Sequence, residues 1–325
     1  MKQWIALLTL VLVAFTLEAC SRSLPTAPRK DAASAGTPGA YAAMASPSHA
    51  QEGARVFTAA GDIAASVTAF RDALGALNAN TPGSQAGGRR EINWDAVPAL
   101  FTNTNDFPPD FFNQPVVGRA RGVVSTTPGT GERVSDQNFA DLDPEFAHEF
   151  RFFSPIRTFA PLGSDRLTVT FFVPGSSTPA RSTGFGVVFS DVDRRGSASI
   201  RLFDDEGESL GRFSAPASPG GLSFVGVMFP SSRVARVEIR SGEAAIDAGL
   251  ADISVRRRGD DDDEDDDRDR LSQRVLTLRD DVRGRRHRLH AADLVIMDDF
   301  IFGEPIAAPA SQAGPVASSM SLGTR

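Results

Sequence analysis

The sequence predicts an all-β protein built on an antiparallel β-sandwich. Short segments of alternating apolar and polar residues follow one another in the second half of the chain, separated by turn residues. The last such segment, 294–302, is apolar on both faces. Short strands with turn signals between them and no intervening helices are typical of this fold class.

Composition limits the function more than it defines it. The chain has 325 residues, 41% of them hydrophobic, which allows a folded core and one or two domains. Its net charge of −7 argues against a nucleic-acid partner, because binding phosphates needs a basic surface. The single cysteine, Cys20, excludes disulfides within the chain and cysteine-based metal or redox sites.

The N-terminus has the features of an export signal. Lys2 precedes an apolar run from Ile5 to Leu17, shorter than the roughly 20 residues of a membrane-spanning helix. The run ends in Leu17-Glu18-Ala19-Cys20, which resembles the bacterial lipoprotein cleavage box, although Glu18 stands where a small or apolar residue is usual. We therefore expect residues 1–19 to be a signal peptide and Cys20 to be the lipidated N-terminus.

This anchor places the protein in the cell envelope. Ser21 stands where an aspartate would favour retention in the inner membrane, so the outer membrane is preferred. Cleavage by an ordinary signal peptidase, giving a secreted or periplasmic protein, is the alternative.

Low-complexity segments flank the folded region. Residues 20–55 and 306–325 are rich in Ala, Ser, Pro and Gly, so we expect a flexible tether and a disordered tail. The sandwich is expected over 56–305. Blocks of arginine and aspartate interrupt it at 256–290, where we expect a disordered charged insert outside the sheets. An arm that binds cations or polyanions is the alternative for this insert.

The order of elements within the sandwich follows from the hydrophobic pattern. Residues 63–78 fit a helix or a strand, since apolar residues recur at helical spacing without strong caps. The clearer strands are 166–173, 185–189, 200–202, 222–229, 234–239 and 294–302. Within 222–229 the apolar alternation changes across Gly226, which predicts a β-bulge there.

Several phrases resemble those of a bacterial family of secreted and lipid-anchored proteins. They are GRREINWD (88–95), FSP (153–155), FAP (159–161), TFFVPG (170–175), GFGVVF (184–189), DVD (191–193), GLSF (221–224) and MDDF (297–300). The resemblance covers about 88–305 without the charged insert. It implies a jelly-roll sandwich of the galactose-binding-like kind and no established activity.

An adjacent pair of carboxylates, Asp298 and Asp299, lies in the closing strand. Alternation puts them on opposite faces of a strand that is apolar on both, so at least one should be buried. A buried carboxylate needs a partner, because an unpaired buried charge is very costly. Arg89 and Arg90 are candidate partners if the first and last strands of the sandwich pair.

A structural calcium ion is the alternative partner for these carboxylates. The resemblance implies it, because galactose-binding-like domains often hold calcium near their chain ends through carboxylate and carbonyl oxygens. Asp191 and Asp193, which flank a strand end, are further candidate metal ligands together with Asp298 and Asp299. A solvated turn is the simpler interpretation of Asp191 and Asp193.

Aromatic residues give little support for a sugar-binding platform. Stacking platforms favour Trp and Tyr, and Trp94 is the one such residue in the predicted sandwich. It is therefore the candidate ligand-contact aromatic. Four phenylalanines at 101, 107, 111 and 112 could form the rim of a site or cover an open edge, and covering is favoured.

No motif for catalysis stands in the sequence. The nucleophile elbow, the phosphate-binding glycine loop and the zinc helix are missing. We expect a non-enzymatic, lipid-anchored cell-envelope protein that presents a β-sandwich for binding or structural interaction. The alternatives are a carbohydrate-binding module with a structural calcium and a glycoside-active enzyme. The expected partners are the membrane, through the lipid, and a glycan or an envelope protein.

Cys20→Ser is expected to abolish lipidation, because the thiol is the group that accepts the lipid. Metabolic labelling with a radioactive fatty acid, followed on a gel, measures this directly. The variant should lose the label and accumulate as unprocessed precursor. Labelling and processing equal to those of the parent would contradict a lipid anchor at Cys20.

Overall fold

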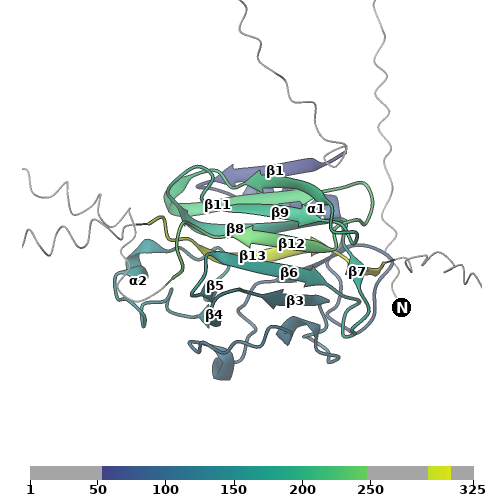
Figure 1. Cartoon of the computed structure of the whole chain (residues 1–325), viewed down its shortest axis with the longest axis horizontal. Helices are drawn as coiled ribbons and strands as arrows, with labels where there is room; N and C mark the ends of the chain where they lie inside the picture. The colour runs from purple at the N-terminus through teal and green to yellow at the C-terminus, as the bar shows by residue number, and fades with distance from the viewer. Residues whose placement is uncertain (1–52, 247–291, 309–325) are drawn as a thin grey trace, which may run out of the picture. The chain divides into compact units, whose positions relative to one another are not determined.

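The described part of the chain is an antiparallel β-sandwich, as the sequence predicts. The structure, a computed structural model, describes residues 53–246 and 292–308 (Figure 1). Two sheets supply nearly all of its strands. The chain passes repeatedly from one sheet to the other, which is the connectivity of a jelly roll.

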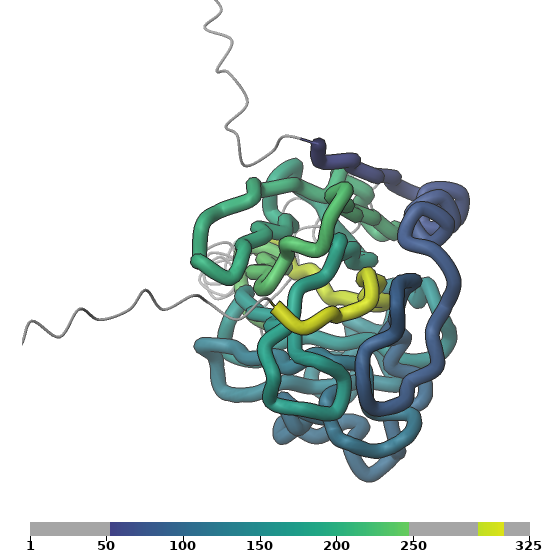
Figure 2. Tube along the Cα trace, turned by 90° about the vertical axis from the view of Figure 1, so that its right-hand side faces the viewer, coloured from purple at the N-terminus to yellow at the C-terminus, as the bar shows by residue number. Residues whose placement is uncertain are grey.

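The larger sheet has seven strands. In spatial order they are β1 (Arg55–Ala60), β11 (Ser218–Met228), β8 (Gly184–Val192), β13 (Ile296–Gly303), β5 (Thr158–Leu162) and β4 (Gly131–Ser135), with β2 (Arg89–Ile92) also paired to β13. Figure 2 shows the closing strand β13 (yellow) running through the middle of the body, with β1 (purple) at its margin.

The smaller sheet has five strands and lies against one face of the larger. Their order is β10 (Ser209–Ser214), β9 (Ser199–Phe203), β12 (Arg236–Arg240), β6 (Arg166–Phe171) and β3 (Val123–Thr126). A separate two-stranded ribbon joins β7 (Ala180–Arg181) to β14 (Ile306–Ala307).

Helical elements are short. They are α1 (Ala64–Leu74), α2 (Phe146–Glu149) and two 3₁₀ turns, Ala99–Phe101 and Phe111–Asn113. The ambiguous segment 63–78 is thus a helix over most of its length. Its three buried residues, Val67, Phe70 and Leu74, lie on one face at helical spacing and pack against the larger sheet.

The two sheets differ in how many of their faces are covered. β8 is buried along its whole length, because one face meets the smaller sheet and the other meets α1 and neighbouring loops. β6 and β12 instead alternate between buried and more exposed residues. The smaller sheet therefore leaves its outer face open to solvent.

Gly226 does not form the predicted bulge. β11 keeps a continuous register with β8 from Leu222 to Met228 and with β1 from Ser223 to Met228. Phe224 packs under α1, whereas Val225 and Val227 face the core between the sheets. The apparent change of alternation arises because both faces of this strand are buried.

Boundary predictions need small corrections. β1 begins at Arg55, within the predicted tether, and β14 at 306–307 is ordered against β7 although the tail was expected to begin at 306. The rest of the tether and tail, the signal peptide with Cys20, and the charged insert 256–290 lie outside the described residues. No helix in the described ranges is long and apolar enough to cross a membrane.

Gly226→Ala is expected to destabilise the protein by about 1–3 kcal/mol, because the new methyl group would overpack the site under α1. A Cβ at this position would lie 2.8 Å from the Phe224 ring and 3.0 Å from the Phe70 ring. Gly87→Ala is the matched control, since its Cβ would meet nothing within 4 Å. Urea unfolding measures both variants, and equal midpoints would contradict the close approach of α1.

Candidate functional site

The carboxyl pair of the closing strand lies at a β-bulge. The pairing of β13 with β8 shifts by one residue between Met297 and Phe300, so that Asp298 and Asp299 together stand opposite Val188. Met297 and Phe300 consequently both face the core between the sheets. The expectation that alternation puts Asp298 and Asp299 on opposite faces is wrong, because the extra residue interrupts the alternation and both carboxyl groups contact Ser154.

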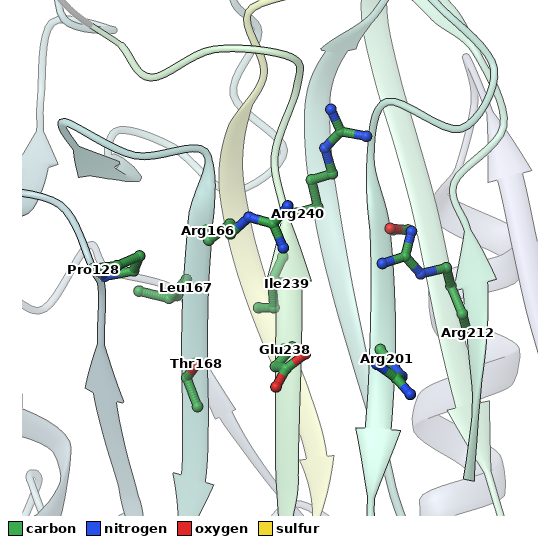
Figure 3. A pocket seen from close by; sticks show the side chains of 10 residues that line it. Pro128, Arg166, Leu167, Thr168, Arg201, Arg212, Glu238, Ile239 and Arg240 are labelled. Carbon is green, nitrogen blue, oxygen red and sulfur yellow. The ribbon is translucent and has the colours of Figure 1, made fainter. Parts of the chain in front are cut away.

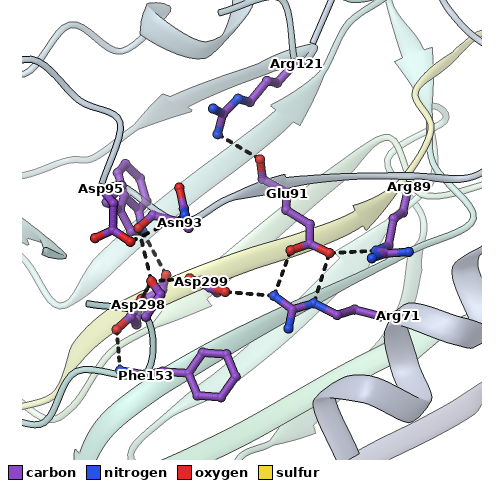
Figure 4. Close-up of polar contacts among 11 residues, drawn as sticks. Arg71, Arg89, Glu91, Asn93, Asp95, Arg121, Phe153, Asp298 and Asp299 are labelled. Carbon is purple, nitrogen blue, oxygen red and sulfur yellow. Dashed lines mark hydrogen bonds and ion pairs between the residues drawn. The ribbon is translucent and has the colours of Figure 1, made fainter. Parts of the chain in front are cut away.

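Four other parts of the chain meet this bulge. β13 pairs with β5 at Met297 and with β2 from Phe300 onward, so its neighbour changes at the bulge. Phe153 and Ser154 form hydrogen bonds with the carboxyl pair at this point (Figure 4). Helix α1 reaches it through Arg71.

Hydrogen bonds satisfy both carboxyl groups in the interior. Asp298 is 0% exposed and Asp299 2%. The Phe153 N–H donates to Asp298 Oδ2 at 2.7 Å. The Ser154 hydroxyl lies 3.0 Å from Asp298 Oδ1 and 2.8 Å from Asp299 Oδ1. The Trp94 indole N–H donates to the backbone carbonyl of Asp298 at 2.8 Å.

One proton shared within this cluster completes the bonding. A serine hydroxyl donates only once, so it cannot serve two ionised carboxylates. Burial, together with the charge of the neighbouring Asp299, raises the pKa of Asp298 to about 9. We therefore expect Asp298 to hold the proton at neutral pH, so that its neutral carboxyl group can donate to Asp299 or to Ser154. Burial also raises the pKa of Asp299, but Ser154 and Arg71 oppose that effect.

Arg71 is the charged partner of the pair. Its Nη2 lies 3.0 Å from Asp299 Oδ2 and 2.7 Å from Glu91 Oε2. Arg89 Nε also forms an ion pair with Glu91 Oε1 at 2.6 Å. Figure 4 shows Arg71 between the two carboxylates.

Arg89 and Arg90 are not partners of the aspartates, so that expectation is wrong. Strand β2, which carries both arginines, does pair with β13, but Arg90 stands opposite Phe302 and Arg89 opposite Gly303, beyond the bulge. Arg90 instead forms a fully buried two-point ion pair with Glu304, with distances of 2.7 and 2.8 Å. Antiparallel register, rather than strand order, decides these partners.

The other predicted metal ligands lie in separate surroundings. The interpretation of Asp191 and Asp193 as a solvated turn is wrong, because they are 0% and 8% exposed. Asp191 Oδ1 accepts the Gly220 N–H at 2.6 Å. The pKa of Asp293 is raised mainly by burial. The charge of the nearby Asp193 raises it as well. No group of three or more His, Cys, Asp or Glu side chains suited to hold a metal occurs within the described ranges. Asp191, Asp193, Asp298 and Asp299 are thus not gathered into one ligand set there.

Trp94 lies in the core, with 2% of its surface exposed, and offers no face to a ligand. Its ring stacks on Phe159 at 4.1 Å between centroids and meets Phe300 edge-on. Phe107 and Phe112 pack on it from the loop side. The phenylalanine cluster therefore covers the core, as favoured from the sequence.

A hollow of about 310 Å³ lies on the open face of the smaller sheet (Figure 3). Arg166, Arg201, Arg212 and Arg240 rise around it from four neighbouring strands, and among the described residues Glu238 is the acidic one that lines it. Thr168 and Ser199 also contribute to its lining.

Register places these side chains in two rows across the sheet. One row runs Arg212, Arg201, Glu238, Thr168, Thr126 from β10 to β3, and the adjoining row runs Ser214, Ser199, Arg240, Arg166. Neighbouring strands lie about 4.8 Å apart, so the residues of a row are close neighbours. The sequence shows outward arginines on individual strands, but only the register brings them together.

A second, shallower hollow of about 240 Å³ lies where β3 and β4 approach each other. Glu132 lines it and is 4% exposed. Burial raises the pKa of Glu132 to about 7, against the opposing effect of its hydrogen bond from the Ser125 hydroxyl. Glu132 is thus a second buried carboxyl group that titrates well above its ordinary pKa.

Comparisons with known proteins give no family. No family model matches the chain, and no curated protein matches it. Among solved structures, it is similar to the enzymatically active domain of tailspike protein 4 of bacteriophage CBA120, with 16% identity and a TM-score of 0.16. That match covers 44% of this chain and 21% of the tailspike chain, and carries no argument about fold or function.

The free energy of unfolding is expected to fall as pH rises above 7, because folding holds a proton on Asp298. The pKa of Asp298 is about 9 in the folded protein and about 3.9 in an unfolded chain. Between these values the folded state binds one proton more, which lowers stability by up to about 1.4 kcal/mol per pH unit. Urea unfolding at pH 7, 8 and 9 measures this slope. The range begins at pH 7 because Glu132, whose pKa is about 7, changes the free energy of unfolding mainly below that pH.

Asp298→Asn is expected to remove this slope, because the neutral amide keeps the shape of the protonated acid and can still donate to Ser154. Asp299→Asn is the matched comparison and should cost about 1.5–3 kcal/mol, because it removes the charged acceptor of Arg71. Parallel pH dependences of the parent and Asp298→Asn would mean that Asp298 is ionised at neutral pH.

Proposed function

We propose that the protein is a non-enzymatic binding protein of the bacterial cell envelope. In this proposal a lipid on Cys20 anchors the chain, preferably in the outer membrane, and the sandwich presents the open face of its smaller sheet to a ligand. The observation that carries the binding role is the hollow on that face.

Unequal covering of the two sheets supports this choice of face. The outer face of the larger sheet is occupied by α1 and by the cluster around α2, so it has no free area beside β8 and β13. In the described part of the chain, no helix or apolar cluster covers the outer face of the smaller sheet. A volume of about 310 Å³ lies at the lower end of the range for small-ligand sites.

The chemistry of the buried acid pair supports a binding role over catalysis. Asp298 and Asp299 share a proton, as catalytic acid pairs do, but they are buried and held by Phe153, Ser154 and Arg71. A substrate has no access to them. The pair is better explained as a structural element.

Thr168→Trp is expected to abolish ligand binding, because the indole would fill the hollow whatever the charge of the ligand. Thr168 lies on a strand, where an aromatic residue is well tolerated, so the fold should persist. A glycan array probed with the full-length chain, with millimolar calcium and with chelator, measures binding by parent and variant.

Thr58→Trp is the matched control, because Thr58 also lies on a strand, at the edge of the larger sheet and away from the hollow. Binding lost in Thr168→Trp and kept in Thr58→Trp is the expected result. Binding unaffected by Thr168→Trp would exclude the hollow. Release of sugar from any arrayed polysaccharide would contradict a non-enzymatic function.

A further inference from the structure

Two arginines stand directly opposite each other in the hollow. Arg212 of β10 is the cross-strand neighbour of Arg201 of β9, and both side chains are exposed. The Cβ atoms of such neighbours lie about 4.5–5.5 Å apart, and like charges at this spacing destabilise a sheet. The fold therefore holds this pair at a cost that an anion between the guanidinium groups would relieve.

No carboxylate neutralises this pair within the described ranges. Arg201 donates to the Ser209 hydroxyl at 3.2 Å and lies over the Phe203 ring, 4.7 Å from its centroid. Glu238 stands beside Arg201 in the same row, but its ion pair is with Arg236. Neither Arg201 nor Arg212 has an acidic side chain within 4.0 Å among these residues.

The second arginine pair of the hollow differs in this respect. Arg166 and Arg240 are also cross-strand neighbours. Asp165 lies 3.0 Å from Arg240 and 3.8 Å from Arg166, so it neutralises part of their charge. Uncompensated charge is thus concentrated on the β9–β10 side, in a chain whose net charge is −7.

We propose that this hollow binds an acidic glycan, with a uronic acid carboxylate held between Arg201 and Arg212. The inference rests on the proposed function, because it names the ligand class of the same site. Two guanidinium groups side by side offer the paired N–H donors that match a carboxylate. The hydroxyls of Thr168 and Ser199 lie in the same hollow and can bond the hydroxyl groups of a sugar.

Nucleic acid fits the same surface less well. Single strands are bound by stacking bases on exposed aromatic rings, but Phe203, the aromatic residue beside the arginines, is 5% exposed. Arg201 and Arg236 also lie over its ring.

Polygalacturonate and its fully methyl-esterified form test the inference, because they share a backbone and differ only in charge. Calorimetry with the full-length chain should show binding of the acid form and none of the ester. The double variant Arg201→Ala/Arg212→Ala should weaken binding by about tenfold or more, since it removes both charge-assisted contacts. Added salt should weaken parental binding further.

Arg55→Ala is the control for charge, because it removes an exposed arginine from the edge of the larger sheet. It should bind the acid form as tightly as the parent. Thermal melting serves as the folding control. The double variant should melt at or above the temperature of the parent, because it removes a repulsive pair.

The possible failures separate the inference from the proposed function. Equal binding of acid and ester that Thr168→Trp abolishes would overturn the acidic ligand and leave the hollow as the binding site. Binding of a single-stranded oligonucleotide in preference to the acid form would overturn the glycan class. Tight binding of the acid form by the double variant would move the site elsewhere.

Discussion

The carboxyl pair in the bulge of β13 joins four separate segments of the chain. The closing strand supplies Asp298 and Asp299, α1 supplies Arg71, the segment after α2 supplies Phe153 and Ser154, and the end of β2 supplies Trp94. Each of these contacts spans more than a hundred residues of sequence. The proton on Asp298 is what allows two carboxyl groups to occupy one buried place.

That constraint explains why the two sheets have different outer faces. The bulge draws α1 toward β13 through Arg71, and the paired glycines Gly186 and Gly226 leave room for the Phe70 ring. The outer face of the larger sheet is thereby closed with apolar contacts. The smaller sheet has no comparable attachment in the described residues, so its outward arginines remain in solvent and define the hollow.

Fold class was predictable from the sequence because alternation in β6 and β12 records one buried and one exposed face. Strand register and bulges were harder to predict in strands buried on both faces, because apolar residues then occur at every position and do not show which face each residue points to. For this reason Gly226 was assigned a false bulge, and the real bulge at Asp298 and Asp299 was missed.

The candidate site was only partly predictable for the same physical reason. Burial of Asp298 and Asp299 followed from their apolar surroundings, whereas the pairing of β2 with β13 entered only as the condition for a contact with Arg89 and Arg90. Arg71, the partner of the two aspartates, is more than two hundred residues away, and no local pattern marks it. The hollow depends on cross-strand register, which brings Arg201 beside Arg212.

The most direct test of this account is a crystal structure of the full-length chain soaked with a short oligogalacturonate. The account predicts electron density for a sugar in the hollow of the smaller sheet, with a carboxylate within hydrogen-bond distance of both Arg201 and Arg212. Density at the loops that join the sheets, with the arginine hollow holding only solvent at a saturating ligand concentration, would contradict it.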